Sequence, residues 1–248
     1  MTLSIDHIVI SVNNLQLAMT NFRQAGFIVN YGGRHADNIT ENALIILGNG
    51  AYIELIALAE GASAEYATFK DLLRPTEGYT GYALLTADLE SAVNRLHQAG
   101  MMTTGGARDG SRYRPDGVLL RWRMARIAQH MSPFIIRDIT SRELHVPVTP
   151  ENIDHPNTVT GIRDIKILAQ DFTDMVFAYQ AITGITPQVT EHEAVFMMDN
   201  SNITLSKPFT PEEQNYLMQN GSVPFLVTFA SNDETAFMLH GARIAFGE

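Results

Sequence analysis

The chain has 248 residues, which fits one large domain or two of ordinary size, and its net charge of −10 argues against a general nucleic-acid binder. It has no cysteine, so disulfides, thiolate metal sites and a cysteine nucleophile are excluded. Hydrophobic content of 45% and charged content of 18% are typical of a globular protein, and without a signal-peptide pattern or an apolar run near about 18 residues we expect it to be cytoplasmic and free of the membrane.

The first predicted element is a buried strand in IDHIVISVNN, which carries His7 near its start. Asn14 then stands where a helix N-cap is expected, apolar residues follow at helical spacing, and Gly26 marks the end of the helix. Three strands are expected after it, near residues 27–32, at ALIILGN and at AYIELIAL. The order of elements is therefore strand, helix and three strands.

This order recurs along the chain. GYALLTADLESAVNRLHQAGM, from Gly81, aligns without a gap on HIVISVNNLQLAMTNFRQAGF, and strands follow it near residues 101–104, at GVLLRWRMARI and at PFIIRDI. A third copy starts at Asp164 and includes the strands AVFMMD and NITLS. A fourth, PFLVTFASNDETAFMLHGARIAF, stops after about one strand, helix and strand. The sequence predicts an α+β protein of repeated βαβββ modules, three complete and a fourth truncated.

Connectors rich in Pro, Gly, Glu and Ser separate the copies, near residues 59–78, 146–160 and 208–222. The third of these connectors contains a candidate short helix at PEEQNYLMQ. This composition is typical of linkers.

These repeats resemble the vicinal oxygen chelate superfamily, whose members include glyoxalase I and the extradiol dioxygenases. Residues 5–137 are most similar to the glyoxalase-like domain of many bacterial proteins, through DHIVISV, GGRHADNITENALIILGNGAYIELI and RPDGVLLRWRMA followed by PFIIRD. The resemblance implies curved mixed sheets around a cleft, a two-module domain at 1–145 and a second, degenerate module pair at 161–248. It also implies metal ligands on the first and last strands of each module.

His7 and Glu54 occupy these two ligand places in the first copy. An imidazole and a carboxylate suit a divalent metal ion, and a glutamate inside an apolar strand is costly unless it is paired or bound to metal. We therefore predict both as catalytic residues and as candidate metal ligands. Two plainer interpretations stay open, a hydrogen-bonded histidine at a strand end and a carboxylate at an open sheet edge or paired with an arginine.

The later copies do not complete a metal site. The residues at their ligand places are Gly81, Arg137 or a direct neighbour, Asp164, Thr204 and Phe225. The fourth copy is expected to end before its last strand. His35 and His130 are the nearest spare imidazoles, and either would complete the set. A divalent metal ion is therefore one candidate cofactor, and no other is indicated.

Eight arginines lie between residues 108 and 142 of this acidic chain. In LLRWRMAR, Arg121 and Arg123 alternate with apolar residues and share one face of a strand, while Arg137 falls near a ligand place of the repeat. They form either an exposed face of the sheet or a cleft wall that binds an anion. His35, in GGRHADN, is a further candidate at the cleft rim.

Two functions remain open from the sequence. The first is a lyase or isomerase of the vicinal oxygen chelate type, which transfers a proton next to a carbonyl of a small, oxygenated, anionic molecule. Glu54 would be its base or ligand, His7 a ligand or proton shuttle, and the arginines would hold developing negative charge. The second is a non-catalytic protein that binds or sequesters a small molecule. A homodimer is among the open assemblies.

Overall fold

The structure is a computed structural model that describes residues 3–66, 72–128 and 133–247. Its first half contains β1 (Ser4–Ser11), α1 (Leu15–Gln24), β2 (Asn30–His35), β3 (Thr40–Ile46), β4 (Tyr52–Leu58), η1 (Ala64–Tyr66), β5 (Gly78–Leu85), α2 (Leu89–Gln98), β6 (Arg108–Tyr113), β7 (Leu119–Arg126) and β8 (Pro133–Asp138). Two short helices, α3 (Arg142–His145) and α4 (Pro150–Ile153), follow. The second half contains β9 (Gly161–Leu168), α5 (Phe172–Thr183), β10 (Gln188–Val189), β11 (Glu193–Met197), β12 (Asn202–Ser206), α6 (Pro211–Asn220), β13 (Pro224–Ala230), β14 (Thr235–Leu239) and β15 (Ala242–Gly247).

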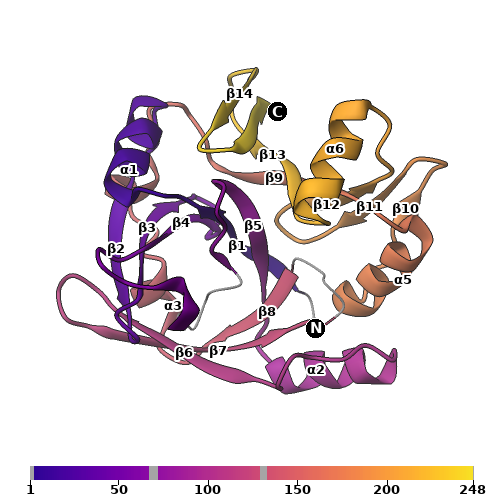
Figure 1. Cartoon of the computed structure of the whole chain (residues 1–248), viewed down its shortest axis with the longest axis horizontal. Helices are drawn as coiled ribbons and strands as arrows, with labels where there is room; N and C mark the ends of the chain where they lie inside the picture. The colour runs from indigo at the N-terminus through magenta and orange to yellow at the C-terminus, as the bar shows by residue number, and fades with distance from the viewer. Residues whose placement is uncertain (1–2, 67–71, 129–132, 248) are drawn as a thin grey trace.

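The described strands form two sheets that lie beside each other (Figure 1). The strands of the first two modules close into a barrel in the order β1-β4-β3-β2-β6-β7-β8-β5. Those of the second half form an open sheet in the order β10-β11-β12-β9-β13-β15-β14. In every module the first and last strands are parallel neighbours, as β1 is with β4 and β5 with β8. The α+β fold with curved mixed sheets is confirmed.

The helices begin where the sequence predicts. Asn14 accepts the amide of Leu17 at 2.9 Å at the start of α1, and Asp88 accepts that of Ser91 at 3.0 Å at the start of α2. Gly26 then follows α1 with a φ of 83°, a conformation that favours glycine. The predicted helix at PEEQNYLMQ is α6.

Two elements differ from the sequence-based expectation. The first strand after α2 is β6 at 108–113, while 101–104 contributes only an isolated bridge at Thr103. In the fourth copy a β-hairpin replaces the expected helix, because His240 and Gly241 both take positive φ and close a tight turn between β14 and β15. β15 then runs parallel to β13, so the last strand of the fourth module is present after all.

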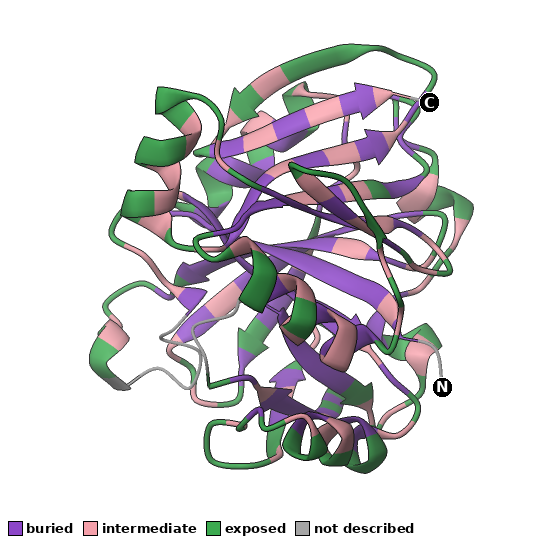
Figure 2. Cartoon of the chain, turned by 90° about the vertical axis from the view of Figure 1, so that its right-hand side faces the viewer, coloured by how far each residue is buried: buried purple, intermediate pink, exposed green. Residues whose placement is uncertain are grey.

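The main hydrophobic core lies between the barrel wall, the helices and the second sheet, and it takes residues from both halves. Figure 2 shows buried strands through the middle of the molecule and exposed helices at its margins. Tyr82 of β5 donates to Tyr179 of α5 at 3.0 Å within this core. A smaller apolar cluster, which includes Val9, Trp122 and Phe134, lies inside the barrel. Among the described helices, none is long and apolar enough to cross a membrane.

Candidate functional site

The barrel encloses a cavity of about 30 Å³ with one apolar end and one polar end. The apolar end is formed by Ile56, Leu72, Trp122, Met124, Phe134 and Ile136. The polar end contains Glu54, three histidines and Arg112, all contributed by different strands or by α3. A largely apolar lining with a few converging polar groups is typical of a small-molecule binding site.

His7 and Glu54 meet at the polar end. β1 and β4 are adjacent, with Val9 opposite Glu54, and His7 Nε2 lies 3.5 Å from Glu54 Oε2. Only 3% of His7 and 7% of Glu54 is exposed. The His7 ring stacks on Tyr52 at 4.5 Å between ring centres. The two predicted site residues therefore lie side by side on neighbouring strands.

His35 approaches Glu54 from the opposite side. Its Nε2 is 3.8 Å from Glu54 Oε1, and its Nδ1 is 2.7 Å from the hydroxyl of Thr40. Burial lowers the pKa of His35, against an opposing effect of Glu54, so the imidazole is neutral near pH 7. The carboxylate is thus flanked by two imidazole nitrogens. Asn42 also donates to Glu54 Oε1, at 2.6 Å.

Gly32 and Gly33 of β2 stand at positions where a larger side chain would not fit. A Cβ on Gly32 would lie 2.2 Å from Oδ1 of Asn42, and one on Gly33 would overlap the carbonyl oxygen of Tyr113. Gly33 also has a φ of 115°. The two glycines therefore admit the Asn42 side chain and let β2 approach β6, which sets His35 in place.

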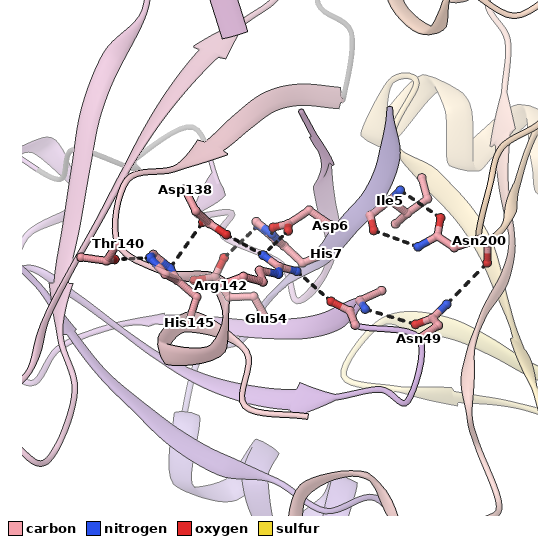
Figure 3. Close-up of polar contacts among 12 residues, drawn as sticks. Ile5, Asp6, His7, Asn49, Glu54, Asp138, Thr140, Arg142, His145 and Asn200 are labelled. Atoms are coloured by element: carbon pink, nitrogen blue, oxygen red, sulfur yellow. Dashed lines mark hydrogen bonds and ion pairs between the residues drawn. The ribbon is translucent and has the colours of Figure 1, made fainter. Parts of the chain in front are cut away.

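Asp6 holds the other nitrogen of His7, as Figure 3 shows. Its Oδ2 is 2.5 Å from His7 Nδ1, and Arg142 Nη1 is 2.5 Å from its Oδ1. Burial acts to raise the pKa of Asp6, but the hydrogen bond from His7 and the charge of Arg142 outweigh it and the pKa is lowered. Asp6 is therefore an anion and His7 Nδ1 donates to it. Nε2, the other ring nitrogen of His7, is then directed at Glu54, so one proton can pass between these two groups.

The polar network continues to α3 (Figure 3). Arg142 Nη1 is 3.2 Å from Asp138, whose other oxygen is 3.6 Å from His145 Nδ1. His145 Nε2 lies 2.5 Å from the hydroxyl of Thr140. Burial raises the pKa of Asp138 and lowers that of His145. Hydrogen bonds and ion pairs thus join the Glu54 end of the cavity to the segment after β8.

Arg112 supplies the guanidinium that faces the cavity. It is 6% exposed and donates to the carbonyl oxygen of Gly32. Burial lowers its pKa, with Tyr52 and Glu54 acting in the opposite direction, but an arginine stays charged at neutral pH. No sequence pattern singles out this arginine, because the strand RDGSRY lacks an apolar alternation. Asp6 was also missed, since regular alternation puts it on the face opposite to His7; a register shift at this point of β1 brings the two together.

Of the two interpretations of Arg121, Arg123 and Arg137, the cleft wall that binds an anion is wrong and the exposed face of the sheet is the one observed. Along β7, Trp122 and Met124 line the cavity, while Arg121 and Arg123 point outward. Arg121 is exposed, and Arg123 Nη1 lies 2.5 Å from Glu90 of α2, to which Arg137 also comes within 3.7 Å. The two parallel strand pairs show why Arg137 was misplaced.

In the second module, Ala83 of β5 lies opposite Phe134 of β8. In the first module, Val9 of β1 lies opposite Glu54 of β4 in the same way. Phe134, and not Arg137, therefore stands at the place of Glu54 in the second module, and it lines the apolar end of the cavity. The prediction failed because a shift of three residues along a strand moves a side chain to the other face of the sheet.

The second half carries its own polar pair at the corresponding places. Thr204 donates to Asp164 at 2.6 Å, and burial raises the pKa of Asp164 to about 6. Lys166 lies 3.5 Å from Glu213 of α6. The predicted positions of Asp164 and Thr204 on the first and last strands of the third module are confirmed.

The donor set at Glu54 does not fit a bound metal as it stands. His7, His35 and Glu54 are suitable in kind, but Glu54 Oε1 already accepts a hydrogen bond from Asn42. Within residues 3–66, 72–128 and 133–247, no three or more His, Cys, Asp or Glu side chains are arranged to hold a metal ion. His130 lies outside the described residues. We therefore derive no chemical step through a metal.

Comparisons with known proteins agree with this architecture. A family model of the glyoxalase-like domain matches residues 5–183, and no curated protein matches by sequence. A hypothetical protein from Staphylococcus aureus superposes with a TM-score of 0.78 at 15% identity, over 99% of both chains. A mutant of 4-hydroxymandelate synthase from Streptomyces coelicolor gives 0.63 at 11% identity, over 94% of this chain and 72% of that one.

A xylose isomerase-like TIM barrel/4-hydroxyphenylpyruvate dioxygenase fusion protein gives a TM-score of 0.55 at 13% identity. The match covers 94% of this chain and 37% of the fusion protein. At such identities these structures show the fold alone. Since the family model spans most of the chain and the repeated modules have the matching topology, the protein belongs to the glyoxalase-like domain family of the vicinal oxygen chelate superfamily.

Proposed function

We propose that the protein is a lyase or isomerase that moves a proton next to a carbonyl group of a small anionic molecule. The observation that carries this proposal is the buried carboxylate of Glu54, which two imidazole nitrogens approach within 3.8 Å inside a cavity. A positioned carboxylate beside an imidazole is the usual equipment for general acid–base catalysis.

Glu54, Arg112 and His7 have separate roles in this proton transfer. Glu54 takes the proton when the C–H bond next to the carbonyl breaks. The electron pair of that bond forms a C=C bond, and the π pair of the carbonyl moves onto its oxygen. Arg112 stabilises the resulting enolate oxygen by its charge. His7, held by Asp6, passes the proton to or from Glu54 through Nε2. Return of the proton to another carbon gives an isomer, and loss of a leaving group gives an elimination product.

A non-catalytic sequestration protein remains the second candidate. The apolar end of the cavity favours it, since a ring or alkyl group would bind there without any chemistry. In that case Glu54 would serve only to orient the bound ligand through its neighbours Asn42 and His35.

Hydrogen exchange separates the two functions. The protein is incubated in D₂O with a panel of small oxo acids, and deuterium uptake next to each carbonyl is followed by NMR. We expect uptake with wild type, a loss of at least about 100-fold in Glu54→Gln and wild-type uptake in Glu90→Gln, an exposed glutamate on α2. Saturable binding of a panel member without uptake would support sequestration instead.

The metal ion expected from the sequence at His7 and Glu54 is tested separately. Metal content is measured on protein purified without a histidine tag. Roughly one divalent ion per chain, lost in Glu54→Ala, would support a metal-assisted form of the same reaction. A metal-free protein that still catalyses exchange would assign the proton transfer to the side chains alone.

A further inference from the structure

The cavity at Glu54 is too small to hold a whole substrate. Its volume of about 30 Å³ has room for about two water molecules, since one occupies about 10–15 Å³ on the same measure. Only the reacting end of a substrate therefore fits beside Glu54, and the remainder must lie elsewhere.

A second cavity about ten times larger adjoins the first. Its volume is about 310 Å³, and Arg112 and His145 line both cavities. Arg112 is almost fully buried, and Thr140 and Asp138 hold His145 from the side of β8. These two side chains form the junction between the cavities.

The walls of the second cavity, which we call the α3 groove, are largely apolar. Leu44 and Ile46 project from the inner face of β3, and Leu144 and Pro147 face them from α3 and the segment after it. At the outer end, Arg114 is paired with Asp116 at 2.7 Å, so its charge is already balanced. The buried cation within reach of both spaces is Arg112.

We propose that the Glu54 cavity and the α3 groove form one binding site for an amphipathic carboxylic acid. Its carboxylate binds Arg112 at the junction, and its straight apolar tail of several carbons lies along Leu44, Ile46 and Leu144. The proposal rests on the proposed function only in sending the reacting end toward Glu54; binding of the tail does not require any turnover.

Binding of straight-chain carboxylates tests the proposal. The dissociation constants of acetate, butyrate, hexanoate and octanoate are measured by calorimetry or ligand-observed NMR on the full chain. Each methylene that enters the groove should tighten binding about fourfold, which corresponds to about 0.8 kcal/mol. 1-Octanol should bind at least about tenfold more weakly than octanoate, because its neutral hydroxyl cannot form an ion pair with Arg112 or accept two parallel hydrogen bonds from the guanidinium.

Two variants locate the tail. Leu144→Glu places a charge in the groove and should remove the dependence on chain length while acetate binds as before. Leu17→Glu is the matched control, because Leu17 is an exposed helical leucine on α1, outside both cavities. In Leu17→Glu the dissociation constants of the four carboxylates should equal those of wild type.

Three results would overturn the proposal. They are an affinity of wild type that does not depend on chain length, an unchanged dependence on chain length in Leu144→Glu, and 1-octanol binding as tightly as octanoate. Glu54→Gln separates it from the proposed function: the series should persist in this variant while hydrogen exchange is lost. If affinity depends on chain length but wild type shows no hydrogen-exchange activity, the groove is still a binding site and the proposed enzymatic function is refuted.

Discussion

A single imidazole lies between two carboxylates in this protein. Asp6 accepts from Nδ1 of His7 at 2.5 Å, and Glu54 lies 3.5 Å from Nε2. Asp6 has almost no solvent exposure and is held as an anion by Arg142, so it fixes which nitrogen of His7 carries the first proton. It acts on Glu54 only through His7 and is a positioning residue.

Asp6→Asn should therefore slow hydrogen exchange by about 10- to 100-fold, as is usual for groups that orient a functional histidine. The physical reason is the loss of the charge that stabilises a protonated His7. NMR of the His7 ring nitrogens should show a changed protonation pattern, which a merely structural role would not produce. Asp109→Asn is the control, because Asp109 is an exposed partner of Arg123. An unchanged exchange rate in Asp6→Asn would remove His7 from the proton path.

The raised pKa of the Asp164 carboxyl leads us to expect an unusual dependence of stability on pH. Its pKa is raised from 3.8 to about 6, chiefly by burial, so the folded state prefers its protonated form. Its contribution to stability is complete below pH 3.8 and is lost as the pH rises through about 6. A shift of about 2 pH units corresponds to about 3 kcal/mol, an upper bound because the group is partly solvated.

Asp164→Asn removes this loss while it keeps an oxygen for the hydroxyl of Thr204. In urea unfolding the variant should gain on wild type by about 1 to 3 kcal/mol at pH 7 and gain little at pH 4. Asp233→Asn, at an exposed position, should show no such difference between the two pH values. A gain at pH 4 as large as that at pH 7 would contradict the assigned titration.

At the scale of elements, strand β6 was the hardest to find from sequence. RDGSRY has no apolar alternation, and the sequence instead predicts this strand near residues 101–104. Its inner face needs only two residues: Gly110, which makes room for the ring of Trp122, and Arg112, which faces the cavity. In contrast, the caps at Asn14 and Asp88 are local signals and were found.

The same difference explains the candidate site. His7, Glu54 and His35 were found because a polar residue in or beside an apolar strand stands out. The sequence leaves the face of the arginines open, since which side of a sheet becomes the inside of a barrel depends on closure between distant strands. His145 and Arg142 were missed because they lie on a segment outside the repeated modules.

Gly110→Ala tests the fit between β6 and β7. An added Cβ would lie 2.3 Å from Nε1 of Trp122, so the indole must move or the strands must separate. We expect a loss of about 1 to 3 kcal/mol in unfolding free energy. Trp122 is the only tryptophan of the chain, so a change in its fluorescence reports directly on the cavity. Gly247→Ala, where the added Cβ meets nothing, is the control. Unaltered fluorescence and stability in Gly110→Ala would show that β6 is more adaptable than this packing implies.

At the scale of the molecule, the two halves are joined beside the site. The main core takes residues from both of them, and Asn200, in the turn between β11 and β12, reaches the start of β1. The Ile5 amide donates to Asn200 Oδ1 at 3.2 Å, and Asn200 Nδ2 donates to the Ile5 carbonyl at 3.3 Å (Figure 3). Asn200 also accepts from Asn49 through its backbone oxygen. The second half thus holds the strand that carries Asp6 and His7.

Asn200→Ala should loosen β1 at this end. Both bonds to Ile5 are lost, and we expect about 1 to 3 kcal/mol of destabilisation because the groups left behind are partly buried. Amide hydrogen exchange should rise at Ile5 and its neighbours in β1 and remain near wild type in β7, which lies on the far side of the barrel order. Asn232→Ala, at an exposed position of the same half, serves as the control. If β1 stayed as protected in Asn200→Ala as in wild type, the second half would support the site only through the shared core, and the polar contact at Ile5 would have no role in placing His7.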